Sequence, residues 1–382
     1  MAVARSGSSE AALLKGSPIP LYYQLAQRLK DDILSGRCPA NARFHSDRDL
    51  VARYKISLLT VRQAMSELVN EGLLERRQGA GTFVSRRGPE MLRKSAAPTP
   101  RQTRALLFTG WSPATLSGWA AMYFRDIVEG IQKEAATHGL RLIFDDLNRE
   151  QDPEASLAEA TPAGVVALVG SGVRERVARM AARGVSVVTV NFAVPGLPSV
   201  RPDDYQGGRL AAERLLKSGH RRLVHLNSGE NEVHWTEVKR AYREAIREAG
   251  LPLGAHPVLE GDRRGGTIEA GYQLARKALA LRPRPNAIFA GNDLLAIGAL
   301  QRLREAGIDV PRQASVIGFD DIQAAEICAP PLTTISVDRI ALGRMAVRKV
   351  LAASTNTSEQ LGPVRLRERE SVAAPSRGGV GR

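Results

Sequence analysis

Two segments of the sequence carry polar side chains whose types and spacing suit binding chemistry. The first follows Ser57 and reads LLTVRQAMSELVNEG, with apolar residues at helical spacing along one face. Those apolar residues are Val61, Ala64, Met65 and Leu68. The other face and its edges carry Leu59, Thr60, Arg62 and Gln63. A helix that packs by one face and is polar on the other can enter the major groove of DNA and hydrogen-bond to base edges.

The second segment places a carboxylate at the end of an apolar strand. Asp293 follows the run Ala287–Ala290 within the sequence AGND and opens a helical stretch. Open α/β sheets bind their ligands at the carboxyl ends of parallel strands. Two interpretations stay open: the Asp293 carboxylate accepts hydrogen bonds from ligand hydroxyls, or it caps its own helix by accepting backbone N–H groups.

The elements before the first segment complete a helix-turn-helix. One helical face, ending before Gly36, is formed by Leu21, Leu25, Leu29 and Ile33. Ser46 opens SDRD, which has the S-x-x-D spacing of a capping box, so a short helix begins there. Only Lys55–Ile56 separates that helix from Ser57, and Gly72 ends the next one. We therefore predict two short helices joined by a tight turn.

A β-hairpin is predicted directly after these helices. Residues 73–84 read LLERRQGAGTFV, which is two short strand patterns around a glycine-rich tip. Arg76 and Arg77, beside that tip, suit contact with phosphates or with the minor groove.

The stretches PLYYQL, SDRDLVARY, ISLLTVRQAMSELVNEGLL and RRQGAGTFV together resemble the GntR-type winged helix over residues 20–84. The family's DNA-contacting positions match four residues of this chain. They are Arg48, Thr60, Arg62 and Gly79. We therefore expect DNA contact from these residues and from their neighbours Leu59, Gln63 and Arg77.

Two positions depart from the family pattern. Leu58 stands where the family often has an arginine, and His45 stands where it has a proline. For Leu58 and Leu59 the alternatives are packing on the domain and contact with a thymine methyl group. For Arg62 the alternative to DNA contact is a solvated helix charge.

From residue 105 onward, short apolar runs alternate with amphipathic helical stretches such as 124–138 and 205–218. The runs are Ala105–Thr109, Leu140–Phe144, Gly164–Val169, Val185–Val190, Leu223–Leu226, Ala287–Ala290 and Ser315–Phe319. This alternation predicts parallel sheets with helices on both faces. Gly207 and Gly208, at the start of one helix, predict close packing between that helix and a strand.

Four motifs in this part, DDYQGGRLAAE, AGND, SVIGFDD and PPLTTISVD, resemble the LacI/GalR-type sensor over residues 105–352. That resemblance implies two α/β subdomains joined by three crossings, near residues 203, 311 and 338, with the ligand between them. A GntR-type head on a LacI-type sensor is similar to the arabinose-repressor architecture.

The same resemblance identifies candidate effector-binding residues. They are Tyr123, Phe124, Asn191, Trp235 and Asp293. Trp235 either stacks on a sugar face or packs against Tyr242. Val238 stands where the family carries an arginine that binds the ligand, which argues against a ligand held by that arginine.

Composition limits the alternatives. The net charge is +14, and residues 1–104 hold 18 Lys/Arg against 9 Asp/Glu, a net of +9. That favours a polyanionic partner, although a generally basic composition gives the same signal. Cys38 and Cys328 lack neighbours at metal-ligand spacing, so no disulfide framework, metal or cofactor is expected. Without an apolar run of membrane-spanning length or a secretory signal, a cytoplasmic protein away from membranes is expected.

The predicted fold class is multidomain: an N-terminal winged helix of α+β type and a C-terminal α/β periplasmic-binding-protein-like domain of two Rossmann-like subdomains. The expected boundaries are a disordered N-terminus at 1–17, the winged helix at 18–85, a linker at 86–104, the sensor at 105–362 and a loose tail at 363–382.

Our hypothesis is a homodimeric DNA-binding regulator, more a repressor than an activator, that reads a pseudo-palindromic double-stranded operator and responds to a sugar or sugar-like effector. The alternatives are a cytoplasmic solute receptor, a constitutive DNA binder without effector response, and an enzyme fused to a DNA-binding head. The enzyme alternative is disfavoured because the six histidines are scattered and no G-x-S-x-G occurs.

Overall fold

A computed structural model describes most of the chain. The described residues are 21–34, 37–77, 80–85, 105–109, 121–145, 162–168, 173–229, 233–261, 266–352 and 358–375. The chain divides into two compact units between Ser95 and Ala96, inside the segment predicted to be a linker. That segment, the N-terminal residues 1–17 and Gly79 lie outside the described residues.

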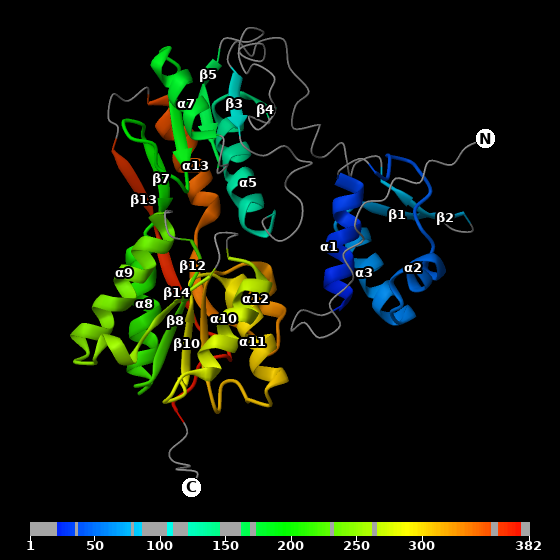
Figure 1. Ribbon diagram of the computed structural model, residues 1–382. Helices are drawn as coiled ribbons and strands as arrows, with labels where there is room; N and C mark the ends of the chain where they lie inside the picture. The colour runs from blue at the N-terminus through cyan, green and yellow to red at the C-terminus, as the bar shows by residue number, and fades with distance from the viewer. Residues whose placement is uncertain are drawn as a thin grey trace. The chain divides into compact units, whose positions relative to one another are not determined.

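The first unit is a helical core followed by a hairpin (Figure 1). Its elements are α1 (Leu21–Leu34), α2 (Asp47–Tyr54), α3 (Leu58–Asn70), β1 (Leu74–Arg77) and β2 (Gly81–Val84). The strands pair antiparallel, and an isolated bridge joins Arg43 to Phe83 beside them. The apolar faces predicted for the helices form one buried core that includes Leu25, Leu29, Leu50, Met65 and Leu68.

The two helix starts predicted in this unit are confirmed. The Ser46 side chain accepts from the Asp49 N–H while the Asp49 carboxylate accepts from the Ser46 N–H, which is a complete capping box. Ser57 caps α3 by accepting from the Thr60 N–H at 3.1 Å. Lys55 ends α2 in the left-handed conformation, so the connection to α3 is short.

The second unit contains two six-stranded sheets, which define a first and a second lobe (Figure 1). The first lobe has the strand order β13-β7-β6-β5-β3-β4, all parallel. Its strands are β3 (Ala105–Thr109), β4 (Arg141–Asp145), β5 (Pro162–Ala167), β6 (Val187–Val190), β7 (Ser199–Pro202) and β13 (Glu359–Gly362). Helices α5 (Ala121–Thr137), α7 (Val173–Ala182) and α13 (Arg339–Leu351) belong to this lobe.

The second lobe has the strand order β14-β12-β11-β10-β8-β9, parallel except for β14. Its strands are β8 (Leu223–Asn227), β9 (Val258–Glu260), β10 (Ala287–Ala290), β11 (Ser315–Asp320), β12 (Thr333–Val337) and β14 (Val364–Arg367). Its helices are α8 (Asp204–Lys217), α9 (Val233–Glu248), η1 (Leu253–Ala255), α10 (Ile268–Ala280), α11 (Asp293–Glu305) and α12 (Gln323–Ile327). The predicted parallel α/β class is confirmed.

Glycines permit the closest contacts between elements. A Cβ on Gly207 would lie 2.5 Å from the Phe319 ring of β11, so the predicted helix–strand packing at the start of α8 is present. A Cβ on Gly130 of α5 would lie 2.1 Å from the backbone oxygen of Ile340 on α13. The backbones of these two helices therefore touch, which seats α13 firmly in the first lobe.

The chain crosses between the lobes three times. Two crossings, after β7 at residue 203 and after β12 at residue 338, lie where they were expected. The third joins β13 to β14 at Pro363 and not near residue 311, which connects α11 to β11 within the second lobe. The connection between the edge strands β13 and β14 thus replaces the crossing that the resemblance implied near residue 311.

The segment expected to be a loose tail is also part of the fold as far as it is described. Strand β14 pairs antiparallel with β12, and Ser371 is fully buried. The Ser371 hydroxyl donates to the Val316 backbone oxygen and accepts from the Thr333 N–H. These bonds fasten residues 364–375 to the second lobe, so the sensor extends beyond its predicted end at 362.

Candidate functional site

The recognition helix predicted from the sequence, α3, leaves one face open to solvent. Its side chains Val61, Ala64, Met65 and Leu68 are buried in the core of the first unit. Leu59 is 77% exposed, and Arg62 and Gln63 are also exposed. Thr60 is half-buried, and its hydroxyl lies 2.7 Å from the Ser57 hydroxyl at the start of the helix.

Helix α2 contributes to the same surface through an ion pair. Asp47, in the first turn of α2, lies 3.5 Å from Arg62 of α3, and the Arg62 side chain is 62% exposed. Arg48 is exposed on α2. Because the Arg62 pair is solvent-exposed and long, it costs little to break when another anion approaches.

The hairpin holds Arg77 against its own strands. The Arg77 Nε donates to Glu75 at 2.9 Å, and its guanidinium lies 4.4 Å from the centre of the Phe83 ring. Arg76 is exposed beside it. The tip residue Gly79 lies outside the described residues, so the hairpin is defined here by its two strands.

In the second unit, polar residues from both lobes meet near the carboxyl ends of the strands. We call this set the inter-lobe cluster. Its members are Tyr123, Asp126, Asn191, Asp204, His234, Asp320 and Arg339.

A chain of alternating charges runs through the cluster from the first lobe to the second. Glu359 of β13 accepts two hydrogen bonds from Arg201 of β7, which also donates to Asp204 Oδ2 at 3.0 Å. The other oxygen of Asp204 lies 2.7 Å from Nδ1 of His234, and Nε2 of His234 lies 2.9 Å from the Gly291 backbone oxygen. The His234 ring therefore donates from both nitrogens and is an imidazolium. Burial lowers the pKa of His234, but Asp204 and the nearby Asp320 outweigh it and raise that pKa to about 9.

Asp320, at the end of β11, has a carboxylate without a protein hydrogen bond among the described residues. Its backbone φ is +112°, which is unusual for a residue with a side chain. Its backbone oxygen accepts a hydrogen bond from Arg339. Burial raises the pKa of the carboxyl to about 7, against the opposing charges of His234 and Arg339.

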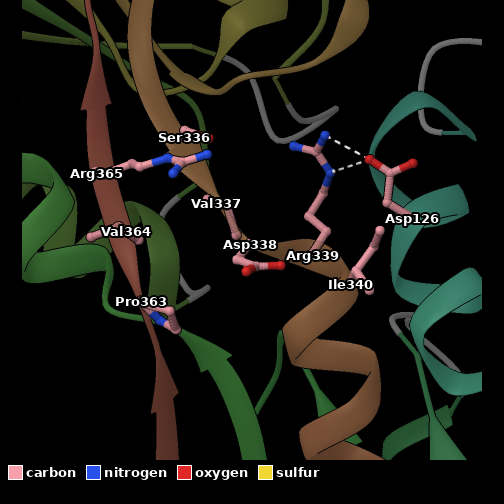
Figure 2. A pocket seen from close by; sticks show the side chains of 9 residues that line it. All are labelled: Asp126, Ser336, Val337, Asp338, Arg339, Ile340, Pro363, Val364 and Arg365. Carbon is pink, nitrogen blue, oxygen red and sulfur yellow. Dashed lines mark hydrogen bonds and ion pairs between the residues drawn. The ribbon is translucent and has the colours of Figure 1, made fainter. Parts of the chain in front are cut away.

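Arg339 joins the lobes at the second crossing. Its Nε and Nη2 donate to Asp126 Oδ2 of α5 at 3.1 and 2.8 Å, and Nη2 also donates to the Asp321 backbone oxygen at 3.2 Å. Figure 2 shows Arg339 and Asp126 pointing toward one another. Both residues line a hollow of about 310 Å³, as does Arg365 of β14. Residues of both lobes thus line this hollow at the hinge.

Asp293 is fully buried and both of its oxygens have protein partners. Oδ1 accepts from the Thr334 hydroxyl at 2.5 Å, and Oδ2 accepts from the Ile322 N–H at 2.9 Å. Asn292, and not Asp293, caps α11, since its side chain accepts from the Leu295 N–H. Burial, followed by the charge of Asp320, raises the pKa of Asp293 well above its usual value. In this conformation Asp293 joins the start of α11 to Thr334 of β12 and to the segment after β11.

Trp235 is only 6% exposed and lies among glycines. A Cβ added at Gly229, Gly266 or Gly291 would come within 2.6 to 2.8 Å of the indole. The His234 ring meets the indole edge-on, with ring centres 4.8 Å apart. The Trp235 side chain is therefore packed between His234 of the inter-lobe cluster and these glycines in this conformation.

The remaining sequence-predicted residues lie in or beside the cluster on the first-lobe side. Tyr123 and Phe124 pack edge-to-face at the start of α5, with ring centres 5.2 Å apart, and Arg339 lies over the Tyr123 ring. The Asn191 side chain lies beside the Tyr123 hydroxyl. The Asn191 Oδ1 is buried and has no partner in the described part of the chain.

Among the residues that the structure describes, no three or more His, Cys, Asp or Glu side chains are grouped so that they could hold a metal ion. No helix among them is both long and apolar enough to cross a membrane.

Comparison with protein families divides the chain as the structure does. Residues 21–84 match the family described as bacterial regulatory proteins, gntR family, and residues 212–372 match a periplasmic binding protein-like domain. The chain also resembles the structure of the transcriptional regulator CelR in complex with cellobiose, at 23% identity and a TM-score of 0.60 over 90% of this chain and 98% of that one. At that identity the likeness establishes the fold.

Curated relatives add the functional class. The arabinose metabolism transcriptional repressor of Geobacillus stearothermophilus is 26% identical over 88% of this chain and 92% of its own length. The HTH-type transcriptional repressor PurR of Vibrio parahaemolyticus is 30% identical over 60% of this chain and 70% of its own length. The chain therefore belongs to the same family as these transcriptional repressors. Its head is of the GntR type and its sensor is periplasmic-binding-protein-like, as the sequence predicted.

The sequence analysis did not identify five residues of the cluster, which are Asp126, Asp204, His234, Asp320 and Arg339. Asp320 lies within the SVIGFDD motif, but a motif alone does not show which carboxylate of the site has its hydrogen bonds filled. His234 and Arg339 gain their roles through Asp204 and Asp126, which are 30 and 213 positions away in sequence. The sequence did offer one signal for His234, which directly precedes the candidate residue Trp235.

Val238, at the position expected to carry an arginine, is fully buried, with its backbone against Gly208 of α8. His234 precedes it by four positions on α9, so the two share a helical face. His234 lies one turn nearer the start of α9 than Val238 does.

Proposed function

We propose that the repressor leaves its operator when a neutral, hydroxyl-bearing small molecule binds at the inter-lobe cluster. The carboxylate of Asp320 carries this proposal, because among the carboxylates of the cluster it is the one without a protein hydrogen bond in the described part of the chain. An ionised carboxylate offers two oxygens to hydroxyl donors, and Asn191 Oδ1 offers another buried acceptor. A sugar or sugar-like compound presents such donors on adjacent carbons.

Charge in the cluster favours a neutral effector over an acidic one. Asp204 is bonded to Arg201 and His234, Asp126 to Arg339, and Asp321 to Arg369. These cations already have carboxylate partners, whereas Asp320 adds a further negative charge when ionised. A carboxylate or phosphate ligand would meet that charge in a buried site. The arabinose-metabolism name of one relative agrees with a sugar effector.

We further infer that the repressor acts in the cytoplasm as a homodimer whose two heads read a pseudo-palindromic operator. Coupling requires that the effector bind more tightly to the conformation that holds DNA poorly. The three crossings, and the bonds from Arg339 to the backbone oxygens of Asp320 and Asp321, are the places where a change in lobe arrangement can be stabilised.

A thermal-shift screen tests the effector class. The panel contains arabinose, ribose, xylose, galactose and cellobiose, with gluconate, glucuronate and ribose 5-phosphate as anionic counterparts. A ligand at a hundredfold excess over its Kd stabilises the folded state by about 2.7 kcal/mol, which shifts Tm measurably. We expect a neutral compound to bind and to release operator DNA in a gel-shift assay. Binding by only the anionic compounds would contradict the proposed class, and binding without release would favour a constitutive DNA binder.

The Asp320→Asn variant tests the site. Asparagine keeps the shape of the side chain and tolerates positive φ, but it removes one acceptor oxygen and the charge. We expect effector affinity to fall at least tenfold while operator binding and folding are retained. Asp309→Asn, at an exposed position of the second lobe, is the matched control and should bind effector normally. Unchanged effector affinity in Asp320→Asn would place the ligand elsewhere.

A further inference from the structure

The first turn of α3 exposes two leucines on the surface proposed to bind DNA. Leu58 is 42% exposed and Leu59 is 77% exposed. The other large hydrophobic side chains exposed in the described residues are Leu253 and Leu361, at 37% and 43%, and both belong to the second unit. Leu59 is therefore the most exposed leucine that the structure describes.

Packing within the head does not explain why position 59 carries an apolar side chain. The helix is anchored by Val61, Ala64, Met65 and Leu68, which are at most 1% exposed. Leu59 lies three and four positions before Arg62 and Gln63, so it shares the outer face with those two exposed polar residues. An apolar side chain kept on that face gains stabilisation only when another surface covers it.

The chemistry of the surroundings indicates which surface covers Leu59. Arg62 and Gln63 on the same helix, and Arg48 on α2, present hydrogen-bond donors that suit phosphates and base edges. A leucine has no donor or acceptor and cannot hydrogen-bond to guanine, cytosine or adenine. The one apolar group that unmodified DNA presents in the major groove is the 5-methyl group of thymine.

We propose that Leu59, with Leu58 beside it, reads the 5-methyl group of a thymine in the operator. This inference rests on the proposed DNA-binding function of the α2–α3 surface and specifies one base that it recognises. The same contact would accept 5-methylcytosine, which presents a methyl group at the equivalent place in the groove, and would reject unmethylated cytosine.

The first step of the test is to define the operator. Full-length protein is used to enrich binding sequences from random double-stranded DNA. We expect a defined motif with at least one invariant T·A pair in each half-site. Failure to enrich any motif would overturn the proposed sequence-specific function itself. A motif without an invariant T·A pair would overturn only the present inference.

The second step removes the methyl group alone. Each invariant thymine is replaced by deoxyuridine, and affinity is measured at fixed salt because phosphate contacts make affinity salt-dependent. Loss of one buried methyl group should weaken binding about fourfold. Replacement of the pair by C·G should weaken binding more, and methylation of that cytosine at C5 should restore part of it. Equal affinity for thymine and deoxyuridine at every invariant position would overturn the proposal.

The third step assigns the effect to Leu59. Leu59→Ala should bind thymine and deoxyuridine operators equally, because the side chain that senses the methyl group is gone. Leu253→Ala is the matched control, an exposed leucine of the second unit, and should keep the wild-type preference. A Leu59→Ala protein that retains the full thymine preference would contradict the assignment. A variant that binds DNA normally but changes its sedimentation would instead identify Leu59 as a protein–protein contact.

Discussion

Arg339 and Asp126, 213 positions apart, are joined within the first lobe of the sensor by two hydrogen bonds from Arg339 to a single Asp126 carboxylate oxygen (Figure 2). Arg339 begins α13 at a chain crossing, and Asp126 lies on α5 of the first lobe. The same guanidinium also donates to the backbone oxygens of Asp320 and Asp321 in the second lobe. One side chain therefore holds both lobes and the strained end of β11.

We predict that Arg339→Met lowers the free energy of unfolding by about 2–4 kcal/mol, because Asp126 and two backbone oxygens lose their donor in a largely buried site. Urea denaturation of the full chain measures the change. Arg365→Met is the matched control: Arg365 lines the same hollow but is exposed, so we expect a change within about 0.5 kcal/mol. Equal losses in both variants would mean that the lobes are not held by the Arg339 side chain.

In the head, we predict that Arg62→Ala weakens operator binding by about 1–3 kcal/mol if the side chain reads a base. Its ion pair with Asp47 is exposed, so the free energy of unfolding should change by less than about 1 kcal/mol. Arg37→Ala is the control, because Arg37 is 64% exposed and paired with Asp32 but lies outside the predicted contact set. A gel-shift titration in which both variants match the wild type would leave Arg62 as a solvated helix charge.

For Asp293, we predict that replacement by alanine destabilises the sensor by about 2–4 kcal/mol, since the Thr334 hydroxyl and the Ile322 N–H lose their acceptor in a buried site. Thr334→Val removes one of these bonds and should cost less. Denaturation of both variants, together with effector titration, distinguishes a structural role of Asp293 from direct binding of the effector. A stable Asp293→Ala protein that no longer binds effector would make Asp293 a direct ligand residue in place of a structural tie.

The helix starts and the parallel sheets could be predicted because their causes are local. Ser46 and Asp49 form the capping box across three positions, and buried strands such as β10 read as continuous apolar runs. Strands β13 and β14 could not be predicted, because they are short edge strands with mostly exposed side chains. Strand β13 pairs with β7, which is distant in sequence, as the pairing of Gln360 with Val200 shows. Strand β14 pairs with β12.

The candidate site, too, could be predicted only where its causes are local in sequence. The position of Asp293 after β10 follows from the strand pattern, but its engagement by Thr334 depends on a residue 41 positions later. The open carboxylate of Asp320 is visible only after those bonds are known. Local patterns therefore located the edge of the sheet where the site lies, and tertiary contacts decided which carboxylate there has its hydrogen bonds filled.

The His234–Asp204 contact makes the stability of the sensor depend on pH. The pKa of His234 in the folded protein is about 9, above its ordinary value of 6.5, because Asp204 and Asp320 together outweigh the effect of burial. The folded state therefore binds this proton more tightly than the unfolded state. The resulting stabilisation is fully present below pH 6.5 and is lost as pH rises through about 9, with an upper limit of about 3 kcal/mol.

We predict that His234→Gln removes this loss between pH 7 and pH 9, so that its free energy of unfolding varies less with pH than that of the wild type. Asp320 contributes in a lower window, between its ordinary pKa and about 7, which is why the comparison begins at pH 7. Urea titrations at several pH values measure both proteins. His138→Gln is the matched control, an exposed histidine directly after α5 whose Nε2 lies 3.4 Å from Glu134, and should follow the wild type. Parallel pH curves for the wild type and His234→Gln would mean that His234 is not held as an imidazolium in the folded repressor.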